Sequence, residues 1–336
     1  MIVFHERFLD HRQADRLHPE SPERLTAILD RLKGLGLWRE VQTPEPAPLE
    51  DVLRVHRKSY LDRLRGFGEG FWDLDTYVGP ETFAIARLAA GGGILAAEQA
   101  WAEGWTVTAL LRPPGHHATP GNAMGFCYLN NIAIAAARLL AEGKGPVAIV
   151  DLDVHHGNGT EEAFYASREV LFVSLHEFAI FPGTGAMGRL GEGAGKGFNV
   201  NIPLGAGCGD GTYELAMDRL VEPIVTQFKP AIVLVSFGAD THAMDPLANL
   251  TLSSPGSVHL VDRLRRLAKD LCQGRLALML EGGYHCEALA EVMAGIVALE
   301  AGKKVATRFN ENRDPQARGR DAIGQVAELQ RDFWRV

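Results

Sequence analysis

Short apolar runs rich in β-branched residues alternate with helix-periodic segments from about residue 80 to residue 300. This alternation is typical of βαβ units, in which helices connect parallel strands and cover the sheet. It predicts an α/β fold with a central, mostly parallel sheet and helices on both faces. We expect strands at residues 2–5, 106–111, 147–151, 170–175, 198–202, 232–237 and 276–280. We expect helices at residues 23–35, 81–102, 129–140, 213–228, 258–271 and 287–299.

The length of the chain is compatible with one domain. Its 336 residues are 46% hydrophobic, which is enough to bury a large core. We expect a single domain over residues 1–336, with a motif-bearing core at about 18–300 and a tail at about 304–336 that ends in one weak helix. Ser21, directly before Pro22, predicts a helix N-cap with proline at the first helical position.

Composition also limits the compartment and the partners. The chain has no apolar run of about 18 residues and no signal-peptide pattern at its start, so we expect a cytoplasmic protein without membrane contact. Its four cysteines form no CxxC pair and are expected to be reduced. A net charge of -8 without a basic block argues against direct nucleic-acid binding and mildly favours cationic partners. The sequence leaves open whether the chain forms a homo-oligomer.

Three long loops follow predicted strands, at residues 113–126, 176–197 and 238–255. Each is rich in glycine, proline and polar residues. Long loops in a compact domain are usually functional, and the carboxyl ends of parallel strands form the ligand crevice of such sheets. We therefore expect the three loops to converge on one rim.

A candidate metal site begins in the segment VAIVDLDVHHGNG, where polar residues follow an apolar strand. Asp153 and His155 are two residues apart on an extended chain and project to one side, with Asp151 behind them. Asp240 follows the next apolar strand of matching character and can complete the set. One imidazole and two carboxylates with an open position suit zinc, although iron(II) or cobalt would tolerate them. The alternative is that these are ordinary hydrogen-bonded residues at strand ends.

Two adjacent histidines and one tyrosine are candidates for proton transfer and oxyanion binding. His116 and His117 lie in a Pro/Gly-rich loop after a strand, and histidine titrates near neutral pH. Tyr284 follows two glycines after the last strand, where its phenol could donate to an oxyanion opposite the metal. Taken alone, each of these features could be purely structural.

Together these segments resemble the histone deacetylase superfamily, which includes acetylpolyamine amidohydrolases and acetoin-utilisation proteins. The resemblance lies in motifs that occur in the family's order from residue 18 to residue 284: HPESPERL, RPPGHHATPGNAMGFCYLN, VDLDVHHGNG, VSLHEFAIFPGTG, GADTHAMDP and EGGY. It implies an arginase-like α/β fold, one catalytic zinc per subunit held by Asp153, His155 and Asp240, and a narrow tunnel for an acylated aminoalkyl chain. The loops are more similar to the class II and bacterial branch than to the polyamine enzymes.

The resemblance also implies catalytic roles. His117 matches the general base and acid, His116 its electrostatic partner, and Tyr284 the residue that polarises the acyl carbonyl together with zinc. Asp151 matches the carboxylate behind His116. Asn158 lies behind His117, where many eukaryotic nuclear members have aspartate, and should leave His117 less basic than a carboxylate would.

A structural potassium ion is a further implication. It would lie near Asp151 and Ser174, with backbone oxygens of Asp153, His155 and Leu175 as further ligands.

The tunnel is the last feature that the resemblance implies. Gly125 and Phe126 would form one wall, Phe181 the other, and Leu247 the rim. Arg24 in HPESPERL would lie at the inner foot of the tunnel, where acetate leaves. From the sequence alone, the wall residues could be ordinary core and Arg24 a surface charge.

The function that follows is zinc-dependent hydrolysis of an amide, which releases acetyl or a related acyl group from acyl-lysine, an acetylpolyamine or another small acylamine. A dinuclear ureohydrolase is disfavoured, because Gly157 and Gly238 stand where further metal ligands would be needed. A non-catalytic module that holds acylated ligands is the alternative from a different class, and the intact set of catalytic residues argues against it.

Overall fold

The computed structural model describes residues 1–12 and 18–336. Its main sheet has eight strands in the order β2-β1-β5-β10-β9-β6-β7-β8, and every neighbouring pair is parallel. The strands are β1 (Ile2–Val3), β2 (Val41–Gln42), β5 (Thr106–Ala109), β6 (Val147–Asp151), β7 (Val170–Glu177), β8 (Asn199–Leu204), β9 (Ile232–Phe237) and β10 (Leu276–Leu280). A separate antiparallel hairpin joins β3 (Gly70–Phe71) to β4 (Tyr77–Val78).

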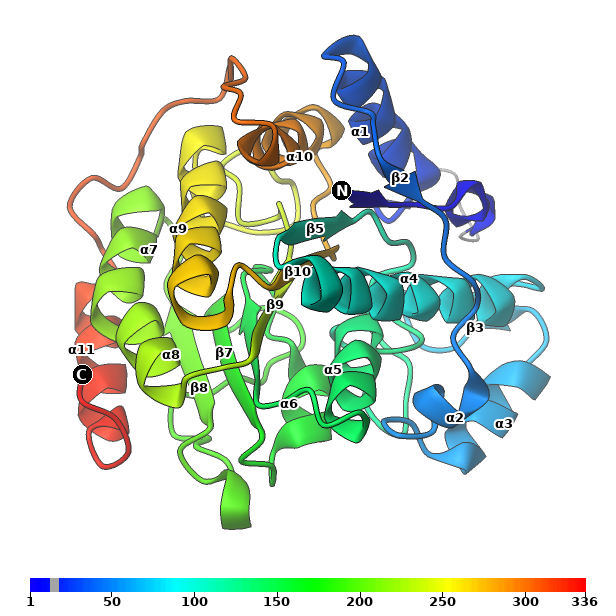
Figure 1. The fold of residues 1–336 in the computed structure, drawn as a ribbon, viewed down its shortest axis with the longest axis horizontal. Coiled ribbons are helices and arrows are strands. Elements are labelled where there is room, and N and C mark those ends of the chain that lie inside the picture. The colour runs from blue at the N-terminus through cyan, green and yellow to red at the C-terminus, as the bar shows by residue number, and fades with distance from the viewer. Residues whose placement is uncertain (13–17) are drawn as a thin grey trace.

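Helices cover both faces of the sheet. The helical segments of the described residues are η1 (Glu6–Asp10), α1 (Pro22–Gly34), α2 (Leu49–Val52), α3 (Lys58–Gly66), α4 (Thr82–Glu103), α5 (Asn131–Ala141), α6 (Asn158–Phe164), η2 (Gly193–Gly195), α7 (Asp210–Ala216), η3 (Met217–Val221), α8 (Glu222–Phe228), α9 (Ser254–Cys272), α10 (Cys286–Glu300) and α11 (Arg320–Gln330). Figure 1 shows α4, α5 and α6 on one side of the strands and α7, α8, α9 and α10 on the other. The predicted α/β architecture is therefore confirmed.

The central strands are buried on both faces, which explains why their sequences are almost entirely apolar. All residues of β6, β9 and β10 are buried. Such strands cannot alternate polar and apolar residues, because helices exclude water from each face. The register aligns Asp151 with Ser236 of β9 and with Ser174 of β7, so the carboxyl ends of these strands lie level at one rim.

Several predicted boundaries differ from the structure. The expected first strand is only Ile2–Val3, β7 extends to Glu177, and the helix expected at residues 213–228 is divided into α7, η3 and α8. The π turn of η3 precedes Pro223, which has no N–H to donate to the preceding turn. Ser21 does occupy the N-cap position before Pro22, but its side chain makes no capping hydrogen bond.

The C-terminal segment packs against the edge of the sheet. Helix α11 contributes the buried side chains of Ile323, Val326 and Ala327 to the main core. The indole N–H of Trp334 donates to the backbone oxygen of Gly197 at 2.8 Å. The weak terminal helix of the tail is thus present and is held by tertiary contacts.

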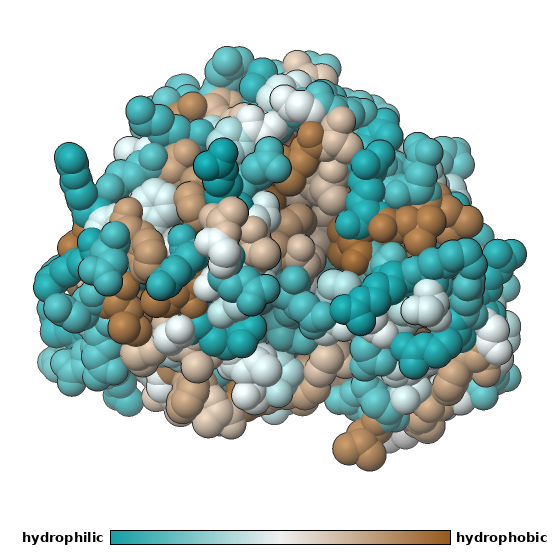
Figure 2. All heavy atoms as spheres, turned by 90° about the horizontal axis from the view of Figure 1, so that it is seen from below, coloured by the Kyte–Doolittle hydropathy of each residue, from teal (hydrophilic) through white to brown (hydrophobic). Residues whose placement is uncertain are grey.

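No helix within residues 1–12 and 18–336 combines the length and apolar character needed to cross a bilayer. Figure 2 shows one face that is mostly hydrophilic, with hydrophobic side chains gathered in separate patches. The four cysteines are all free, and three of them are buried.

Candidate metal centre and active site

Two neighbouring strands bring the predicted metal ligands together. Asp153 and His155 follow β6, and Asp240 follows β9, which is hydrogen-bonded to β6. One ligand atom from each of the three residues lies within 4.8 Å of the other two. The imidazole Nδ1 of His155 is 3.2 Å from Oδ1 of Asp153 and 3.3 Å from Oδ2 of Asp240. The structure therefore assembles the three side chains at one point of the rim.

Backbone groups fix the two carboxylates. The N–H of Gly282 donates to Oδ2 of Asp153 at 2.8 Å, and the N–H of Val154 donates to Oδ1 of Asp240 at 3.0 Å. A Cβ atom added at Gly238 or at Gly282 would collide with both carboxylates. Glycine is required at these two positions because the backbone passes directly against the ligands.

The charge and hydrogen bonding of this cluster fit a bound cation. Both carboxylates are buried, and Oδ2 of Asp240 has no hydrogen-bond partner among the described residues. Burial and the charge of Asp153 raise the pKa of Asp240. Burial opposes protonation of His155, yet its contacts with the two carboxylates raise its pKa to about 10. The site thus needs positive charge, which a divalent ion would supply to all three groups.

The space around the cluster fits one metal better than two. Added at Gly157, a Cβ atom would collide with the carboxylate of Asp151 and approach Nδ1 of His116. At Gly238 the carboxylates of Asp153 and Asp240 fill the space. In the part of the chain that the structure describes, these three ligands form the one cluster of His, Cys, Asp or Glu that could hold a metal.

The two loop histidines lie beside the metal ligands. Their rings are 4.0 Å apart between centroids, and the ring of His117 is 5.9 Å from that of His155. Nδ1 of His116 is 3.0 Å from Oδ2 of Asp151, and Nδ1 of His117 is 2.8 Å from Oδ1 of Asn158. Because each partner atom is an acceptor, each Nδ1 carries a proton and each Nε2 faces away from its partner.

The environments of the two histidines push their pKa values apart. Burial opposes the charged form of His116, but the charges of Asp153 and Asp151 raise its pKa to about 10. Burial and the neighbouring charge of His116 lower the pKa of His117 well below its ordinary value. This electrostatic pattern favours a charged His116 beside a neutral His117.

Tyr284 is held at the rim by its backbone and by its ring. Its N–H donates to Oδ2 of Asp245 at 2.6 Å. The ring is 6.0 Å from that of Phe126, and the guanidinium carbon of Arg24 lies 5.0 Å from the ring centroid. Burial raises the pKa of Tyr284 well above its ordinary value, so the phenol keeps its proton as a donor at neutral pH.

The predicted tunnel residues lie around these groups. The ring of Phe181 is 5.0 Å from that of His117, and a Cβ atom at Gly125 would lie 2.6 Å from the imidazole of His117 and 2.7 Å from the ring of Phe181. Gly125 and Phe126 both adopt positive φ, at 55° and 66°. Leu247 is 40% exposed, and its N–H donates to Asp245, the same carboxylate that holds Tyr284.

Arg24 is completely buried, so the alternative of a surface charge is wrong. Its guanidinium donates to the backbone oxygens of Gly283 at 2.7 Å and Glu281 at 2.5 Å, and lies 3.4 Å from Glu20. Arg24 therefore supports the backbone immediately before Tyr284.

Three residues of the expected potassium site, Asp151, Ser174 and Leu175, lie on the neighbouring strands β6 and β7, and Asp153 and His155 follow β6. Asp151 pairs in register with Ser174, and Leu175 follows on the same strand. Oδ1 of Asp151 accepts the N–H of Asp153 at 3.1 Å, and Oγ of Ser174 is 2.9 Å from Nδ1 of His176.

Two carboxylates that are buried at the rim are not among the site residues predicted from the sequence. Asp245 binds the backbone of Tyr284, as described above, and Glu281 accepts hydrogen bonds from the histidine loop. Glu281 directly follows an apolar strand, just as polar residues follow β6 and β9. This position after a strand is the sequence feature that could have identified it. Asp245 lies within its loop, five residues after the predicted ligand Asp240, and has no such signal.

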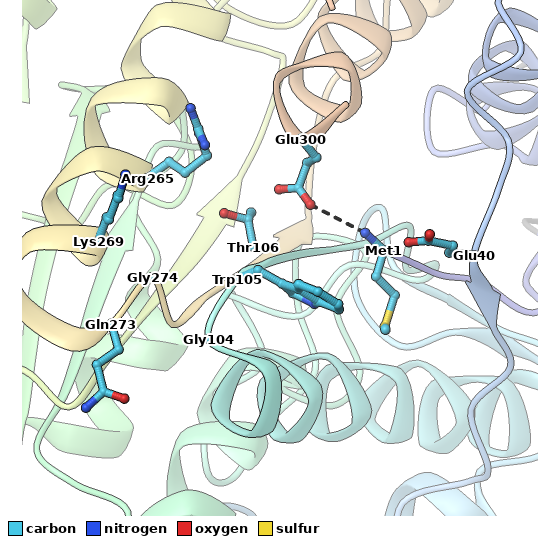
Figure 3. Close-up of a pocket in the computed structure, with 10 residues that line it drawn as sticks. All are labelled: Met1, Glu40, Gly104, Trp105, Thr106, Arg265, Lys269, Gln273, Gly274 and Glu300. Atoms are coloured by element: carbon cyan, nitrogen blue, oxygen red, sulfur yellow. Dashed lines mark hydrogen bonds and ion pairs between the residues drawn. The ribbon is translucent and has the colours of Figure 1, made fainter. Parts of the chain in front are cut away.

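A cavity lies at the end of the strands opposite to the metal ligands. It has a volume of about 490 Å³ and is lined by residues that include Met1, Thr106, Gly274 and Glu300 (Figure 3). Thr106 is the first residue of β5, and Gly274 lies two residues before the start of β10. No predicted site residue lines this cavity, so it is separate from the metal cluster.

The chain is similar to known deacetylases both in sequence and in structure. The histone deacetylase domain matches residues 18–299. A probable deacetylase of Archaeoglobus fulgidus is 41% identical, over 99% of this chain and 95% of the relative. A histone deacetylase-like amidohydrolase of Pseudomonas aeruginosa is 40% identical, over 93% of this chain and 85% of the relative. The crystal structure of the HDA15 HD domain superposes with a TM-score of 0.90 at 33% identity, covering 99% of this chain and 95% of that one.

Proposed function

Because the chain belongs to the histone deacetylase family and is a hydrolase of amide bonds, we propose that it is a zinc-dependent deacylase of amines. Its substrates would be acyl-lysine or small acylamines such as acetylpolyamines. The observation that carries the proposal is the grouping of Asp153, His155 and Asp240 within 4.8 Å, directly beside the histidine pair. We also propose that residues 1–336 form one deacetylase domain.

The proposed ligands of zinc are Asp153, His155 and Asp240. When bound there, zinc would polarise the acyl carbonyl and make water more acidic. The family is generally zinc-dependent, and an imidazole with two carboxylates is a donor set that zinc accepts.

In this proposal His117 moves the proton. Asn158 keeps the proton of His117 on Nδ1, which leaves the lone pair of Nε2 free to accept a proton from the attacking water. The same Nε2–H then donates to the departing amine. His116, tied to Asp151, supplies a neighbouring positive charge that favours release of this proton to the amine.

Tyr284 would stabilise the negative charge that develops on the acyl oxygen. Its hydrogen-bonded backbone and the packing of its ring on Phe126 and Arg24 restrict the position of the phenol. A donor that is positioned before the reaction costs little reorganisation when charge develops.

The remaining site residues would bind the substrate or the potassium ion. Gly125, Phe126 and Phe181 would line the passage for the aminoalkyl chain, with Leu247 at its mouth. Arg24 would lie at its inner end. We propose that potassium binds near Asp151 and Ser174, together with backbone oxygens of Asp153, His155 and Leu175, and serves a structural role.

The test is hydrolysis of an acetyl-lysine peptide beside N-acetylputrescine and N-acetylspermidine by the zinc-loaded protein. We expect cleavage of at least one of these substrates, and we expect that His117→Ala abolishes it. Absence of cleavage of all three by zinc-loaded wild-type protein would refute the proposed substrate range.

A further inference from the structure

Glu281 lies at the centre of the rim without a role in the chemistry proposed above. It follows the last residue of β10 and precedes Gly282, Gly283 and Tyr284. Its side chain is fully buried. A buried carboxylate is costly unless hydrogen bonds compensate for its lost hydration, so its partners indicate what it does.

The carboxylate of Glu281 binds the backbone of the histidine loop. Its Oε2 accepts the N–H of Gly115 at 2.7 Å and the N–H of His116 at 3.2 Å. Its Oε1 accepts the hydroxyl of Ser236, in β9, at 3.1 Å. One side chain therefore connects two central strands to the loop that carries both histidines.

Glu281 is itself fixed relative to the metal ligands. Its N–H donates to the backbone oxygen of Phe237 at 2.8 Å, and its carbonyl accepts the guanidinium of Arg24 at 2.5 Å. The next residue, Gly282, donates its N–H to Asp153. A displacement of the histidine loop relative to the ligands would have to break the bonds that Glu281 makes.

The other supports of this loop act from a different direction. The backbone oxygen of His116 accepts the N–H groups of Gly159 and Thr160 at 3.0 and 3.2 Å. The side chains of His116 and His117 are oriented by Asp151 and Asn158, as described above. These contacts tie the loop to the segment after β6. At the start of α5, the side-chain amides of Asn130 and Asn131 donate to the backbone oxygens of His116 at 3.5 Å and Pro113 at 3.1 Å. Among the described residues, only Glu281 binds the N–H groups of Gly115 and His116 with its side chain and so ties them to β9 and β10.

We propose that Glu281 is a positioning residue that acts through the backbone of Gly115 and His116 to hold the catalytic histidines at their working distance from the metal ligands. This inference rests on the proposed function. Removal of its acceptor oxygens would leave two buried N–H groups without partners, and the loop would move to find others.

Two substitutions of Glu281 distinguish a role in positioning the loop from a role of the negative charge. Glu281→Gln keeps an oxygen that can accept both N–H groups, and its amide can donate to Ser236. Glu281→Met has a similar volume but no acceptor. We expect kcat of Glu281→Gln within about threefold of wild type, and kcat of Glu281→Met about 100-fold lower with KM nearly unchanged, since a displacement of about 1 Å is enough for such a loss.

Hydrogen exchange provides a readout that does not depend on turnover. The amides of Gly115 and His116 are expected to exchange faster in Glu281→Met than in wild type, and at the wild-type rate in Glu281→Gln. Glu291→Met is the matched control, because Glu291 is a buried carboxylate that accepts the backbone N–H groups of Arg308 at 2.9 Å and Phe309 at 3.1 Å. It should destabilise that remote segment and leave kcat and the exchange of the histidine loop unchanged.

The outcomes are distinguishable. Unchanged exchange and kcat in Glu281→Met would overturn the inference, and so would a Glu281→Gln variant as impaired as Glu281→Met, which would indicate a role for charge alone. If Glu281→Met does not fold, Ser236→Ala replaces it, and we expect kcat about fivefold lower, as for the loss of one hydrogen bond. Wild-type kcat in Ser236→Ala would then overturn the inference. A wild-type protein without amidase activity would contradict the proposed function only, because exchange still decides whether Glu281 holds the loop.

Discussion

Substitution of Gly282 by alanine should greatly weaken metal binding without unfolding the chain. An added Cβ atom would collide with Oδ2 of Asp240 and lie 2.7 Å from Oδ2 of Asp153, inside the contact distance of about 3.2 Å expected for carbon and oxygen. Gly282 does not adopt positive φ, so alanine introduces no backbone strain there. The effect is therefore confined to the two carboxylates, which must move apart.

The size of the effect follows from the tolerance of metal sites. Ligand distances in such sites vary by about 0.2 Å, whereas relief of these contacts needs a displacement of about 0.5 Å for Asp153 and of more than about 1 Å for Asp240. We expect zinc affinity to fall at least about 100-fold, as severe a loss as changes around metal ligands usually cause. Competition with a chelating dye measures the dissociation constant, and plasma emission measures the bound zinc.

Gly324→Ala is the matched control for this substitution. Gly324 lies in α11, and a Cβ atom there would have no neighbour within 4 Å. Alanine should stabilise this helix by roughly 0.5–1 kcal/mol and leave zinc binding unchanged. If Gly282→Ala retained wild-type zinc affinity and activity, the ligand assignment to Asp153 and Asp240 would be wrong.

Three further predictions concern the tyrosine, the metal and acid stability. Tyr284→Phe should lower kcat about 100- to 1000-fold with little change in KM, measured by steady-state kinetics. Removal of zinc by a chelator should lower the melting temperature, and added zinc should restore it in wild type but not in Asp240→Ala, because a ligand that binds only the folded state stabilises that state. His56 is buried, donates to the backbone oxygen of Thr119 and accepts the N–H of Asn130, and burial lowers its pKa to about 4. The unfolded chain therefore binds more protons at this histidine between pH 6.5 and 4, and the contribution of His56 to the free energy of unfolding should decrease by roughly 3 kcal/mol as the pH falls through this window; His56→Gln should show a shallower fall in denaturant titrations.

The central strands could be predicted from the sequence for a physical reason. Strands buried on both faces, such as β6 and β9, are apolar except at or near their carboxyl ends, and their predicted bounds agree with the structure. The metal ligands stand out because polar residues follow directly after these runs. Neighbouring parallel strands then bring Asp153, His155 and Asp240 to the same rim.

Other elements are too short to have a periodicity of their own. β2 has two residues, the hairpin of β3 and β4 has two residues in each strand, and α6 has seven. Their conformations depend on partners elsewhere, as in the pairing of Ile2 with Val41. No local pattern could predict them.

The same limit applies to buried charges. Arg24 is on an amphipathic helix, and its partners Glu281 and Gly283 lie more than 250 residues later in the chain. Only the tertiary structure shows that its guanidinium supports the backbone before Tyr284. Glu281 itself had a local signal, a carboxylate after an apolar strand, but its binding of the histidine loop depends on the packing of β5 beside β10.

The most direct test of the proposed chemistry is hydrolysis of an acetyl-lysine peptide and of N-acetylputrescine by wild-type and His117→Ala proteins with equal zinc content. Wild type is expected to cleave at least one of them, and the variant, which keeps all three proposed zinc ligands, is expected to lose at least about 100-fold in kcat. Equal cleavage by the two proteins would contradict the assignment of His117 as the base, and no cleavage by either would contradict the proposed deacylase function for these substrates.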